Sequence, residues 1–200
     1  MALIALAVFA AALTLQGDGR KVGTGLEPTS SACSAGLAAL EDALSSRDRH
    51  RRFLLTDRVD RDVVETLELF GRPGDAPARW VSLPATLPIT YARAPNPELL
   101  KRFADRGWDS VASCPNVRVL VARKGIRIGR PKAQRPRWNQ EYPVATIELS
   151  LPVVSEDDSE ALVYESTVYG PLSGGANALL LRKSPDGRWA VVALHGLWVS

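Results

Sequence analysis

The spacing of apolar positions changes twice along the 200 residues of the chain. Residues 1–15 are almost continuously apolar, residues 33–107 carry apolar positions three and four apart, and from residue 111 onward the spacing becomes two. A spacing of three and four is typical of amphipathic helices, and a spacing of two is typical of strands. Helices followed by strands predict an α+β fold, with N-terminal helices packed on one face of a curved, mainly antiparallel β-sheet.

The first apolar run indicates an export signal over residues 1–17. It is shorter than the about 20 apolar residues that span a bilayer, and Ala10 and Ala12 fit an A-x-A cleavage site. No Lys or Arg precedes the run, and a buried N-terminal helix or strand is the alternative. We therefore expect a periplasmic or secreted protein with no transmembrane span after cleavage.

Residues 18–32 are rich in Gly, Thr, Ser and Pro, which predicts a flexible linker and leaves one α+β domain over residues 33–200. The first helix of that domain has Ser31 or Ser34 as its N-cap. Its apolar positions are Cys33, Leu37, Leu40 and Leu44.

Two further helices are predicted before the strands. One begins at Thr56 or Asp57 and ends at Gly71, with one face formed by Val59, Val63, Leu67 and Phe70. The other has Asn96 as its cap, Pro97 as its first residue and Gly107 as its end, and it buries Leu99, Leu100 and Phe103. The proline-rich residues 72–97 between them predict an irregular segment with a short strand at 89–91.

The second half of the chain predicts several strands. Residues 117–121 and 126–128 alternate, which favours a hairpin that turns at Lys124 and Gly125. Further strands are expected at 144–151, 161–169, 178–182 and 188–193, and residues 195–199 extend the last one. Ser184–Gly187 reads Ser-Pro-Asp-Gly, a typical turn sequence between the last two strands.

Cys33 and Cys114 are the two cysteines of the chain. In an exported protein such a pair predicts a disulfide, and two buried free thiols are the alternative. We expect neither a metal site nor a cofactor, because the two histidines, His50 and His195, would need carboxylates or these cysteines to complete a site.

The formal net charge is +3, which is too small to indicate nucleic-acid binding. Residues 123–137, however, hold seven cations and no acid, and Trp138 follows. Arg127, Arg130, Arg135 and Trp138 are therefore the candidate ligand-binding residues, for an anionic envelope component or an envelope protein. Two solvated loops are the alternative, since an acidic run at 156–160 balances the basic one.

Enzyme motifs are absent from the sequence: no P-loop, dinucleotide-binding, zinc-protease or Cys-x-x-Cys pattern occurs. Ser173 lies in a Gly-rich stretch that lacks the glycine two residues before a nucleophile, so we interpret it as a hairpin connection. His50 lies among charged residues and is expected at the surface. His195 is the weak catalytic candidate, because a histidine in a cleft can act as a base near neutral pH; a half-buried structural histidine is the alternative.

Four aromatic residues fall in the last strands: Tyr164, Tyr169, Trp189 and Trp198. They are expected to form core or to line a ligand pocket between the helices and the sheet.

Residues 163–175, 178–192 and 198–200 resemble the closing β-meander of small exported bacterial proteins of unknown function, with a Gly-containing turn, a D-G-x-W hairpin and a terminal tryptophan strand. The same ending is similar to the last strands of nuclear-transport-factor-2-like domains. The resemblance implies helices packed on a curved sheet. It transfers no catalytic residue, since the Asp and His pair of enzymes with that fold has no counterpart that can be placed in this chain.

The sequence therefore predicts an exported, non-catalytic binding or accessory domain. The alternative is a small periplasmic hydrolase or isomerase that uses His195 together with an acid such as Glu165.

Overall fold

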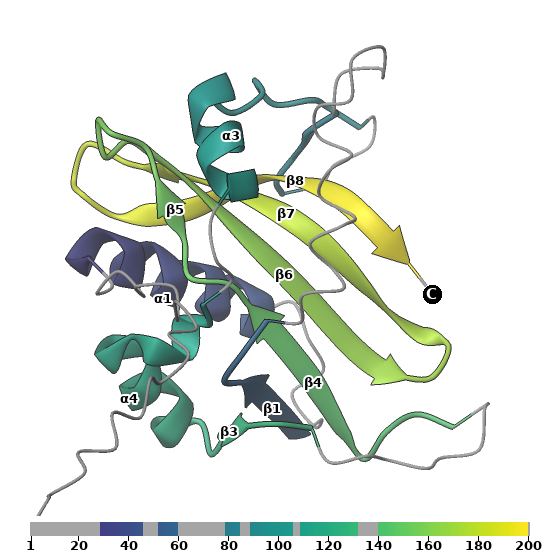
Figure 1. The fold of residues 1–200 in the computed structure, drawn as a ribbon. Helices are drawn as coiled ribbons and strands as arrows, with labels where there is room; N and C mark the ends of the chain where they lie inside the picture. The colour runs from purple at the N-terminus through teal and green to yellow at the C-terminus, as the bar shows by residue number, and fades with distance from the viewer. Residues whose placement is uncertain are drawn as a thin grey trace, which may run out of the picture.

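The computed structural model describes residues 29–45, 52–59, 79–84, 89–105, 109–131 and 140–199. Within them, three α-helices and one 3-10 helix accompany an eight-stranded sheet (Figure 1). The helices are α1 (Ser30–Ser45), α3 (Pro97–Asp105), η3 (Val111–Ser113) and α4 (Pro115–Arg123). The strands are β1 (Arg52–Thr56), β2 (Val81–Ser82), β3 (Arg127–Gly129), β4 (Val144–Leu149), β5 (Val153–Val154), β6 (Glu160–Gly170), β7 (Ser173–Lys183) and β8 (Trp189–Val199). The α+β class is confirmed.

The sheet is mixed but mainly antiparallel. Its strand order is β2-β8-β7-β6-β4-β1-β3, and β5 pairs with β6 beside this path. β1 runs parallel to both β3 and β4, and every other pair is antiparallel. The three long strands β6, β7 and β8 follow one another as a meander, so most of the sheet is built from the last forty residues of the chain.

The turn between β7 and β8 confirms the prediction from the sequence. The amide of Gly187 donates to the carbonyl of Ser184 at 2.8 Å, and Gly187 has a φ of 81°, a conformation that glycine adopts without strain. β8 continues through residues 195–199, as expected. The turn fixes the register as far as Leu181, which lies opposite Val191, and a β-bulge then places Leu180 opposite Ala193.

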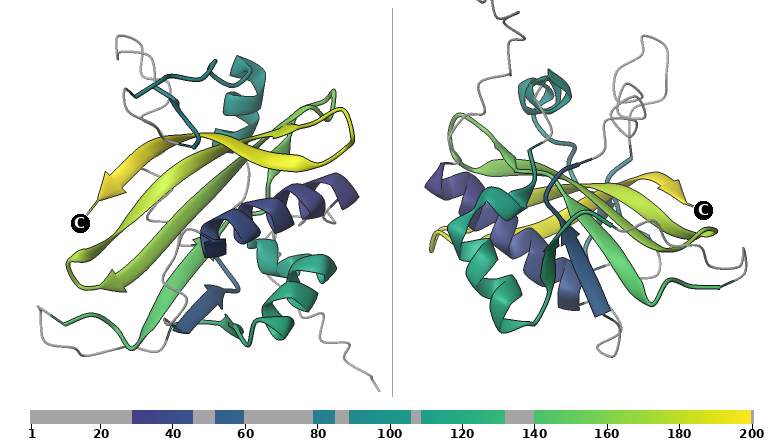
Figure 2. Two further views of the ribbon diagram at one scale, coloured as in Figure 1. Left: turned by 180° about the vertical axis from the view of Figure 1, so that it is seen from behind. Right: turned by 60° about the horizontal axis from the view of Figure 1, so that its bottom comes forward.

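Both faces of the sheet are buried. Val163 and Leu181 belong to a core formed with α1, η3 and α4, whereas Leu162 and Leu180 belong to a second core with α3 and Trp80. Figure 2 shows α1 and α4 on one side of the sheet and α3 on the other. The described helices are thus not confined to one face. Burial on both faces explains why residues 178–181 are all apolar, since such strands lose the alternation of a half-exposed sheet.

Small residues allow α1 to approach the sheet closely. Its buried positions are Ala32, Cys33, Ala35, Gly36, Ala39, Leu40 and Ala43. A Cβ atom on Gly36 would lie 2.3 Å from a methyl carbon of Val111, so only glycine fits between α1 and η3. The predicted Leu37 and Leu44 are only partly buried. The helix therefore packs mainly through alanine, which also has the highest helix propensity.

The start of α1 differs from the prediction. Thr29 caps the helix, because its Oγ1 accepts from the amide of Ala32 at 3.1 Å. Ser31 instead donates to Asp158 in the β5–β6 turn, and Ser34 donates to the carbonyl of Ser30. The helix begins at Ser30, inside the segment predicted as a linker.

Residues 117–121 form part of α4 and not a strand, so the predicted hairpin is wrong. The buried side chains of α4 are Val117, Leu120 and Val121, which are spaced as on one helix face, whereas Val119 is 60% exposed. Pro115 starts the helix, where its missing N–H is not needed. Lys124 and Gly125 form the helix end, with Gly125 at a φ of 66°.

Thr56 does not cap a helix; it is the last residue of β1 and is 3% exposed. β1 lies between β3 and β4 in the sheet, and that position buries Leu54, Leu55 and Thr56. The predicted helix face beyond Val59 lies outside the described residues.

The helix predicted after Asn96 is confirmed as α3. The Oδ1 of Asn96 accepts from the amide of Glu98 at 2.9 Å, as an N-cap does. Leu99 and Phe103 are buried, and Leu100 is partly buried. In the irregular segment before it, Tyr91 makes a single antiparallel bridge to Val81.

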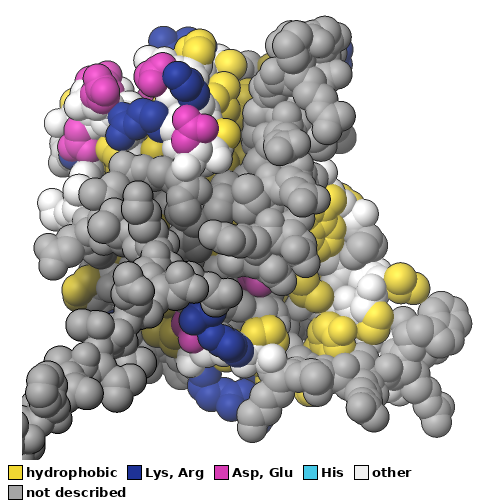
Figure 3. Space-filling view, in the orientation of Figure 1, with side chains coloured by type: hydrophobic (Ala, Val, Ile, Leu, Met, Phe, Trp, Pro, Cys, Tyr) yellow, Lys and Arg dark blue, Asp and Glu magenta, His cyan; other side chains and the backbone are white. Residues whose placement is uncertain are grey.

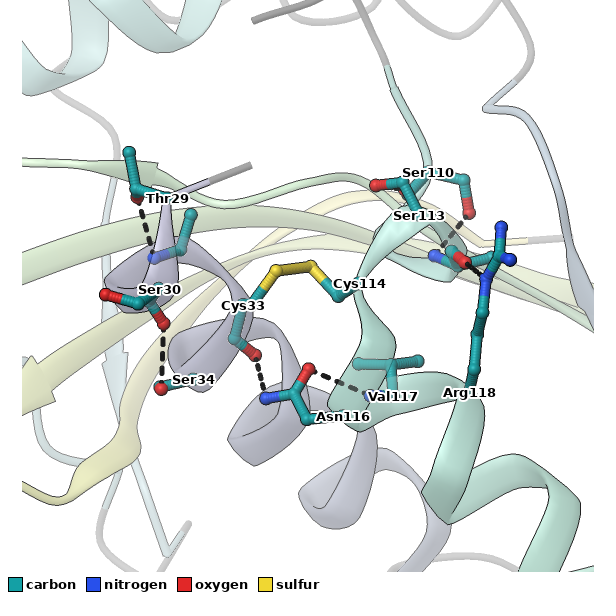
Figure 4. Close-up of a disulfide and its surroundings, with 12 residues drawn as sticks. Thr29, Ser30, Cys33, Ser34, Ser110, Ser113, Cys114, Asn116, Val117 and Arg118 are labelled. Atoms are coloured by element: carbon teal, nitrogen blue, oxygen red, sulfur yellow. Dashed lines mark hydrogen bonds between the residues drawn. A yellow bond between two sulfur atoms is a disulfide. The ribbon is translucent and has the colours of Figure 1, made fainter. Parts of the chain in front are cut away.

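The predicted disulfide is present between Cys33 of α1 and Cys114, which precedes α4 (Figure 4). The two Cα atoms are 5.4 Å apart, within the range that a disulfide requires. Next to it, the side-chain amide of Asn116 donates to the carbonyl of Cys33 at 3.0 Å. The first helix is thus joined to α4 covalently and by a hydrogen bond.

Replacing both cysteines by serine should lower the free energy of unfolding. The disulfide joins residues 81 apart in sequence, and closing a loop of that order stabilises a fold by about 4 kcal/mol in the chain-entropy model. Urea denaturation of the oxidised wild type and the double variant measures the difference. A reductant should lower the midpoint of the wild type only; equal midpoints for the oxidised proteins would contradict the prediction.

Candidate functional site

An open pocket of about 430 Å³ lies on the face of the sheet that α1 covers. The β6–β7 hairpin extends beyond the C-terminal end of α1 (Figure 2), and the pocket is formed where the helix ends. Its lining residues come from α1, the three long strands and the segment after β2: Asp42, Ala43, Leu83, Glu165, Thr167, Tyr169, Gly174, Gly175, Asn177, Leu179 and Leu194.

The register of β6 and β7 brings the polar part of this lining together. Glu165 lies opposite Asn177, and Thr167 lies opposite Gly175. Residues directly opposite in a sheet share a face, and alternate residues of one strand do so too. Since Gly175 carries no side chain, the sheet surface between Thr167 and the end of β8 stays open.

Glu165 is the most buried charged group of the pocket, at 8% exposed. The side-chain amide of Asn177 donates to its Oε2 at 3.2 Å, and the hydroxyl of Thr167 lies 3.5 Å from its Oε1. Burial of a carboxylate is unfavourable unless polar groups compensate it. These two donors hold the carboxylate in the pocket wall.

Asp42 adds a second carboxylate at the opposite wall, in the last turn of α1. The C-terminal end of a helix carries a partial negative charge that basic residues commonly balance, but the last turn of α1 contains no basic residue. Among the described lining residues there are two carboxylates and no Lys or Arg. The described lining therefore combines two carboxylates with an apolar side formed by Leu83, Leu179 and Leu194.

Sequence reasoning named Glu165 only as a partner of His195 and missed Asp42, Thr167 and Asn177. Only a partial signal was present: Glu165, Thr167 and Tyr169 lie two apart on a predicted strand, as residues of one strand face do, but Ser166 between them is polar as well. The contribution of Asp42 could not be found in this way, because it depends on where α1 ends over the sheet.

The structure does not bring His195 and Glu165 together. His195 lies opposite Ala178, which packs in the core with Trp80, whereas Glu165 lies opposite Asn177 and faces the pocket. The two side chains are therefore on opposite faces of the sheet. The Nδ1 of His195 is 3.0 Å from the carbonyl oxygen of Arg79, and its ring centroid is 5.8 Å from that of Trp80. These contacts are those of a half-buried histidine held at the sheet edge.

Ser173 is the first residue of β7 and directly follows the Pro171–Leu172 turn. It lies in a hairpin connection, in agreement with the interpretation from the sequence. His50 lies outside the described residues.

Part of the basic segment lies at the end of the sheet. Arg127 is in β3, the outermost strand, and Arg130 follows it; both are exposed. Figure 3 shows dark blue side chains grouped near β1 and β3 on the viewed face. Lys132, Arg135, Arg137 and Trp138 lie outside the described residues. The described arginines of this segment are not among the residues that line the pocket.

The acidic run at residues 156–160 pairs with a basic residue outside residues 123–137. Lys183 forms an ion pair with Asp158, which also accepts from Ser31 of α1. Asp158 is thereby held between β7 and α1, and the hydrogen bond from Lys183, followed by that from Ser31, lowers its pKa. The described contacts of this run thus anchor the turn to the fold and do not engage residues 123–131.

Glu160 links α3 to the sheet. Its Oε1 accepts from Arg93 and from Arg182, each at 3.0 Å, and its Oε2 accepts from the amide of Asn96 at 3.3 Å. The carboxylate side chain is 7% exposed. Burial opposes its ionisation, but the hydrogen bonds from Arg182, from the Asn96 amide and from Arg93 outweigh burial and lower the pKa of Glu160.

The aromatic residues of the last strands divide between core and pocket. Tyr169 lines the pocket. Tyr164 is fully buried in the core with α3, and burial raises the pKa of its hydroxyl. Trp189 packs in the core with α1, with the Nζ of Lys183 5.5 Å from its ring centre, and Trp198 packs at the margin of the other core.

A scan against protein-family models, a search of curated proteins and a search of solved structures each found no match. The resemblance to nuclear-transport-factor-2-like domains thus stays a prediction from the sequence. In the described part of the chain, no helix has the length and apolar character needed to cross a membrane.

Replacing Glu160 by glutamine should destabilise the protein, because it removes the charge that three donors share. We expect a loss of about 2 kcal/mol near pH 7, the range measured for hydrogen bonds to charged groups. The folded-state pKa lies below the usual value of 4.5, so this stabilisation is present above that value and is lost as the pH falls through the folded-state pKa. Urea denaturation of the wild type and the variant near pH 7 measures the loss of stability, and the same comparison at about pH 3 measures how far this difference decreases in acid.

Asp186→Asn is the matched control. It removes a carboxylate from the β7–β8 turn, where Asp186 and Arg188 form an ion pair with side chains 52% and 85% exposed. Exposed pairs stabilise a fold little, so this variant should unfold near the wild-type midpoint. Equal losses for the two variants would contradict a particular role for Glu160.

Proposed function

We propose that this chain is an exported, non-catalytic domain that binds a small ligand in the pocket at the end of α1. The observation that carries the proposal is the carboxylate of Glu165, held by Asn177 and Thr167 in the wall of an open pocket. Ligand sites in proteins are typically concave and largely apolar, with a few fixed polar groups and volumes of about 300–1,000 Å³. This pocket has all three properties.

The exported setting rests on two features. The apolar run at residues 1–15 has the composition of an export signal, and the bond between Cys33 and Cys114 is of a kind that persists in oxidising compartments. Both support a periplasmic or secreted location, where the ligand would be a solute or an envelope component and not a nucleic acid.

Binding without chemistry is the reading that the site geometry favours over hydrolysis or isomerisation. A general base must lie within hydrogen-bond reach of the reacting group, and His195 faces away from the pocket that holds Glu165. The resemblance of residues 163–200 to nuclear-transport-factor-2-like domains would add a curved sheet whose concave face forms the pocket wall.

Native mass spectrometry of the protein purified from its exporting host tests this proposal. We expect the mass of the chain after removal of the signal, less the two hydrogen atoms lost in forming the disulfide. The mass of a bound molecule should be added to it. The variant Gly175→Val should lose the added mass, because a side chain at residue 175 points into the pocket. A Cβ atom there would lie 3.2 Å from the carbonyl oxygen of Trp198, so thermal unfolding must show that the variant folds.

The control for this experiment is Ala190→Val, which enlarges an exposed side chain of β8 that is not among the described lining residues. It should keep the bound mass. A bare wild-type protein, or an adduct that survives Gly175→Val, would contradict ligand binding in this pocket.

A second contact is proposed at β3, for an anionic envelope component. The observation that favours it is the exposure of Arg127 and Arg130 at the outermost strand. Arginine binds phosphate and carboxylate groups in a bidentate manner, and these are the anionic groups that lipids and acidic proteins present.

Replacing Arg127 and Arg130 by glutamate should abolish binding to vesicles that contain anionic lipid, measured by co-sedimentation. The charge reversal repels the anionic surface, and the binding it removes should also weaken as salt is raised. The double variant Lys101→Glu with Arg102→Glu reverses two charges on α3, away from β3, and serves as the control. Unchanged vesicle binding by the Arg127 and Arg130 variant would exclude this contact.

A further inference from the structure

We infer that the ligand of the pocket is a sugar, a molecule with hydroxyl groups on neighbouring carbon atoms, and that Asn177 binds two of these hydroxyls. The inference rests on the proposed function, because it names the class of ligand for the same site. It stands on the orientation of the Asn177 amide, on the polar side chains around it and on the apolar surface that completes the lining.

The hydrogen bond between Asn177 and Glu165 fixes the orientation of the Asn177 amide. The Nδ2 of Asn177 donates to the Oε2 of Glu165 at 3.2 Å. A carboxylate oxygen accepts, so the nitrogen end of the amide faces Glu165 and the carbonyl oxygen points elsewhere. Asn177 lines the pocket and is partly exposed, and this is the one hydrogen bond of its side chain in the described part of the chain. Its Oδ1 and its second N–H are therefore available to a ligand.

The acceptor and the donor of one amide stand side by side, and a pair of neighbouring hydroxyl groups matches them. A hydroxyl group both donates and accepts, so one hydroxyl donates to the Oδ1 while the next accepts from the N–H. A ligand carboxylate would meet the Oδ1 with a second acceptor, and a ligand ammonium group would meet the N–H with a second donor. Of these three groups, only the hydroxyl pair satisfies both ends of the amide.

The other polar side chains of the lining form hydrogen bonds of the same kind. Glu165, Thr167 and Tyr169 are alternate residues of β6 and line the pocket together with Asn177 and Asp42. These five polar residues are more than the few that orient a largely apolar ligand. Each of their oxygens can take part in more than one hydrogen bond, so a partner within the protein does not prevent a bond to the ligand. Carboxylate, amide and hydroxyl groups all bind hydroxyls, whatever the net charge of the pocket.

A sugar also needs apolar surface, because C–H groups cover the faces of its ring while the hydroxyls project from the edge. Leu83, Leu179 and Leu194 form an apolar side of the pocket, and Tyr169 adds an aromatic ring with a polar tip. Gly175 carries no side chain and leaves the sheet surface beside Thr167 open. The lining thus offers polar groups for the edge of the ring and apolar groups for its faces.

The size of the pocket fits one sugar ring. Its volume of about 430 Å³ lies in the lower part of the range of small-molecule sites. Because the pocket is open, a sugar can enter it free or as the end unit of a glycan. Both sources present the same hydroxyl groups to Asn177.

Ligand-observed NMR with matched six-membered rings tests the inference on the full chain. The two central probes are trans-cyclohexane-1,2-diol and trans-cyclohexane-1,4-diol, which differ only in the spacing of their hydroxyls. Cyclohexanol, cyclohexylamine, cyclohexanecarboxylate and cyclohexanecarboxamide present the other groups on the same ring. We expect the 1,2-diol to bind about fivefold more tightly than the 1,4-diol and than each of these, the effect of one additional hydrogen bond.

Sugars extend the same series. Of glucose, galactose and mannose, at least one should bind more tightly than the 1,2-diol, because a sugar has further hydroxyls for the other polar residues of the lining. The disaccharide of that sugar then identifies the source. Equal affinity supports a free sugar, and tighter binding of the disaccharide supports the end of a glycan, whose second ring lies outside the pocket.

Two variants remove the inferred contacts. Asn177→Ala removes the donor and the acceptor together and should abolish the preference for the 1,2-diol over the 1,4-diol. Tyr169→Ala removes the aromatic ring and should weaken the sugar and the 1,2-diol severalfold; it keeps the test valid if thermal unfolding shows that Asn177→Ala does not fold. Tyr91→Ala is the matched control, because it removes an exposed tyrosine that is not among the described lining residues, and it should leave the affinities unchanged.

The outcomes separate the inference from the proposed function. If another probe binds as well as the 1,2-diol, and Gly175→Val blocks it, the pocket binds ligands but not through a pair of hydroxyls. A 1,2-diol preference that survives Asn177→Ala, or sugar binding that survives Tyr169→Ala unchanged, also overturns the inference. So does the absence of binding by any diol or sugar up to about 10 mM, a concentration at which molecules of this size occupy a ligand site. The proposed function fails as well only if the protein from its host carries no added mass.

Discussion

The close approach of α1 to the sheet is the constraint on which the rest of the structure depends. Apart from Leu40, alanine, glycine and cysteine fill the buried side of the helix, and Gly36 admits no side chain because Val111 of η3 lies against it. A helix with small residues cannot bury much apolar area by itself, so the sheet must supply the larger groups. Leu179, Leu181 and Ile147 do so. The disulfide from Cys33 to Cys114 joins the helix to η3 and α4.

The extent of α1 also determines where a site can form. Under the helix, apolar residues of β6 and β7 are covered and form core. Beyond its last turn, the same strand face carries Glu165, Thr167 and Asn177, and the glycines of β7 leave space above the sheet. A core and a polar pocket thus lie next to each other on one face, because the helix that seals the first stops before the second.

Glu160 and Glu165, two buried carboxylates of the sheet, have different surroundings. Glu160 is surrounded by Arg93, Arg182 and a backbone amide, and this pairing holds α3 against the strands. Glu165 has neutral side-chain donors among its described contacts. The pairing of Glu160 secures a tertiary contact between α3 and the sheet, whereas Glu165 is part of the wall of the pocket.

The sequence by itself determined the local features: the α+β class, the Asn96 cap of α3, the Ser-Pro-Asp-Gly turn and the pairing of the chain's two cysteines. Each follows from neighbouring residues or from composition. It misassigned residues 117–121, because Val117, Val119 and Val121 alternate as in a strand whereas Val117, Leu120 and Val121 are spaced as on a helix face, and packing against α1 decides between them. Only the tertiary structure decided that His195 and Glu165 lie on opposite faces and that Asp42 joins Glu165. The physical reason is that strand register and the end of a helix over a sheet are long-range properties, which no local spacing of residues encodes.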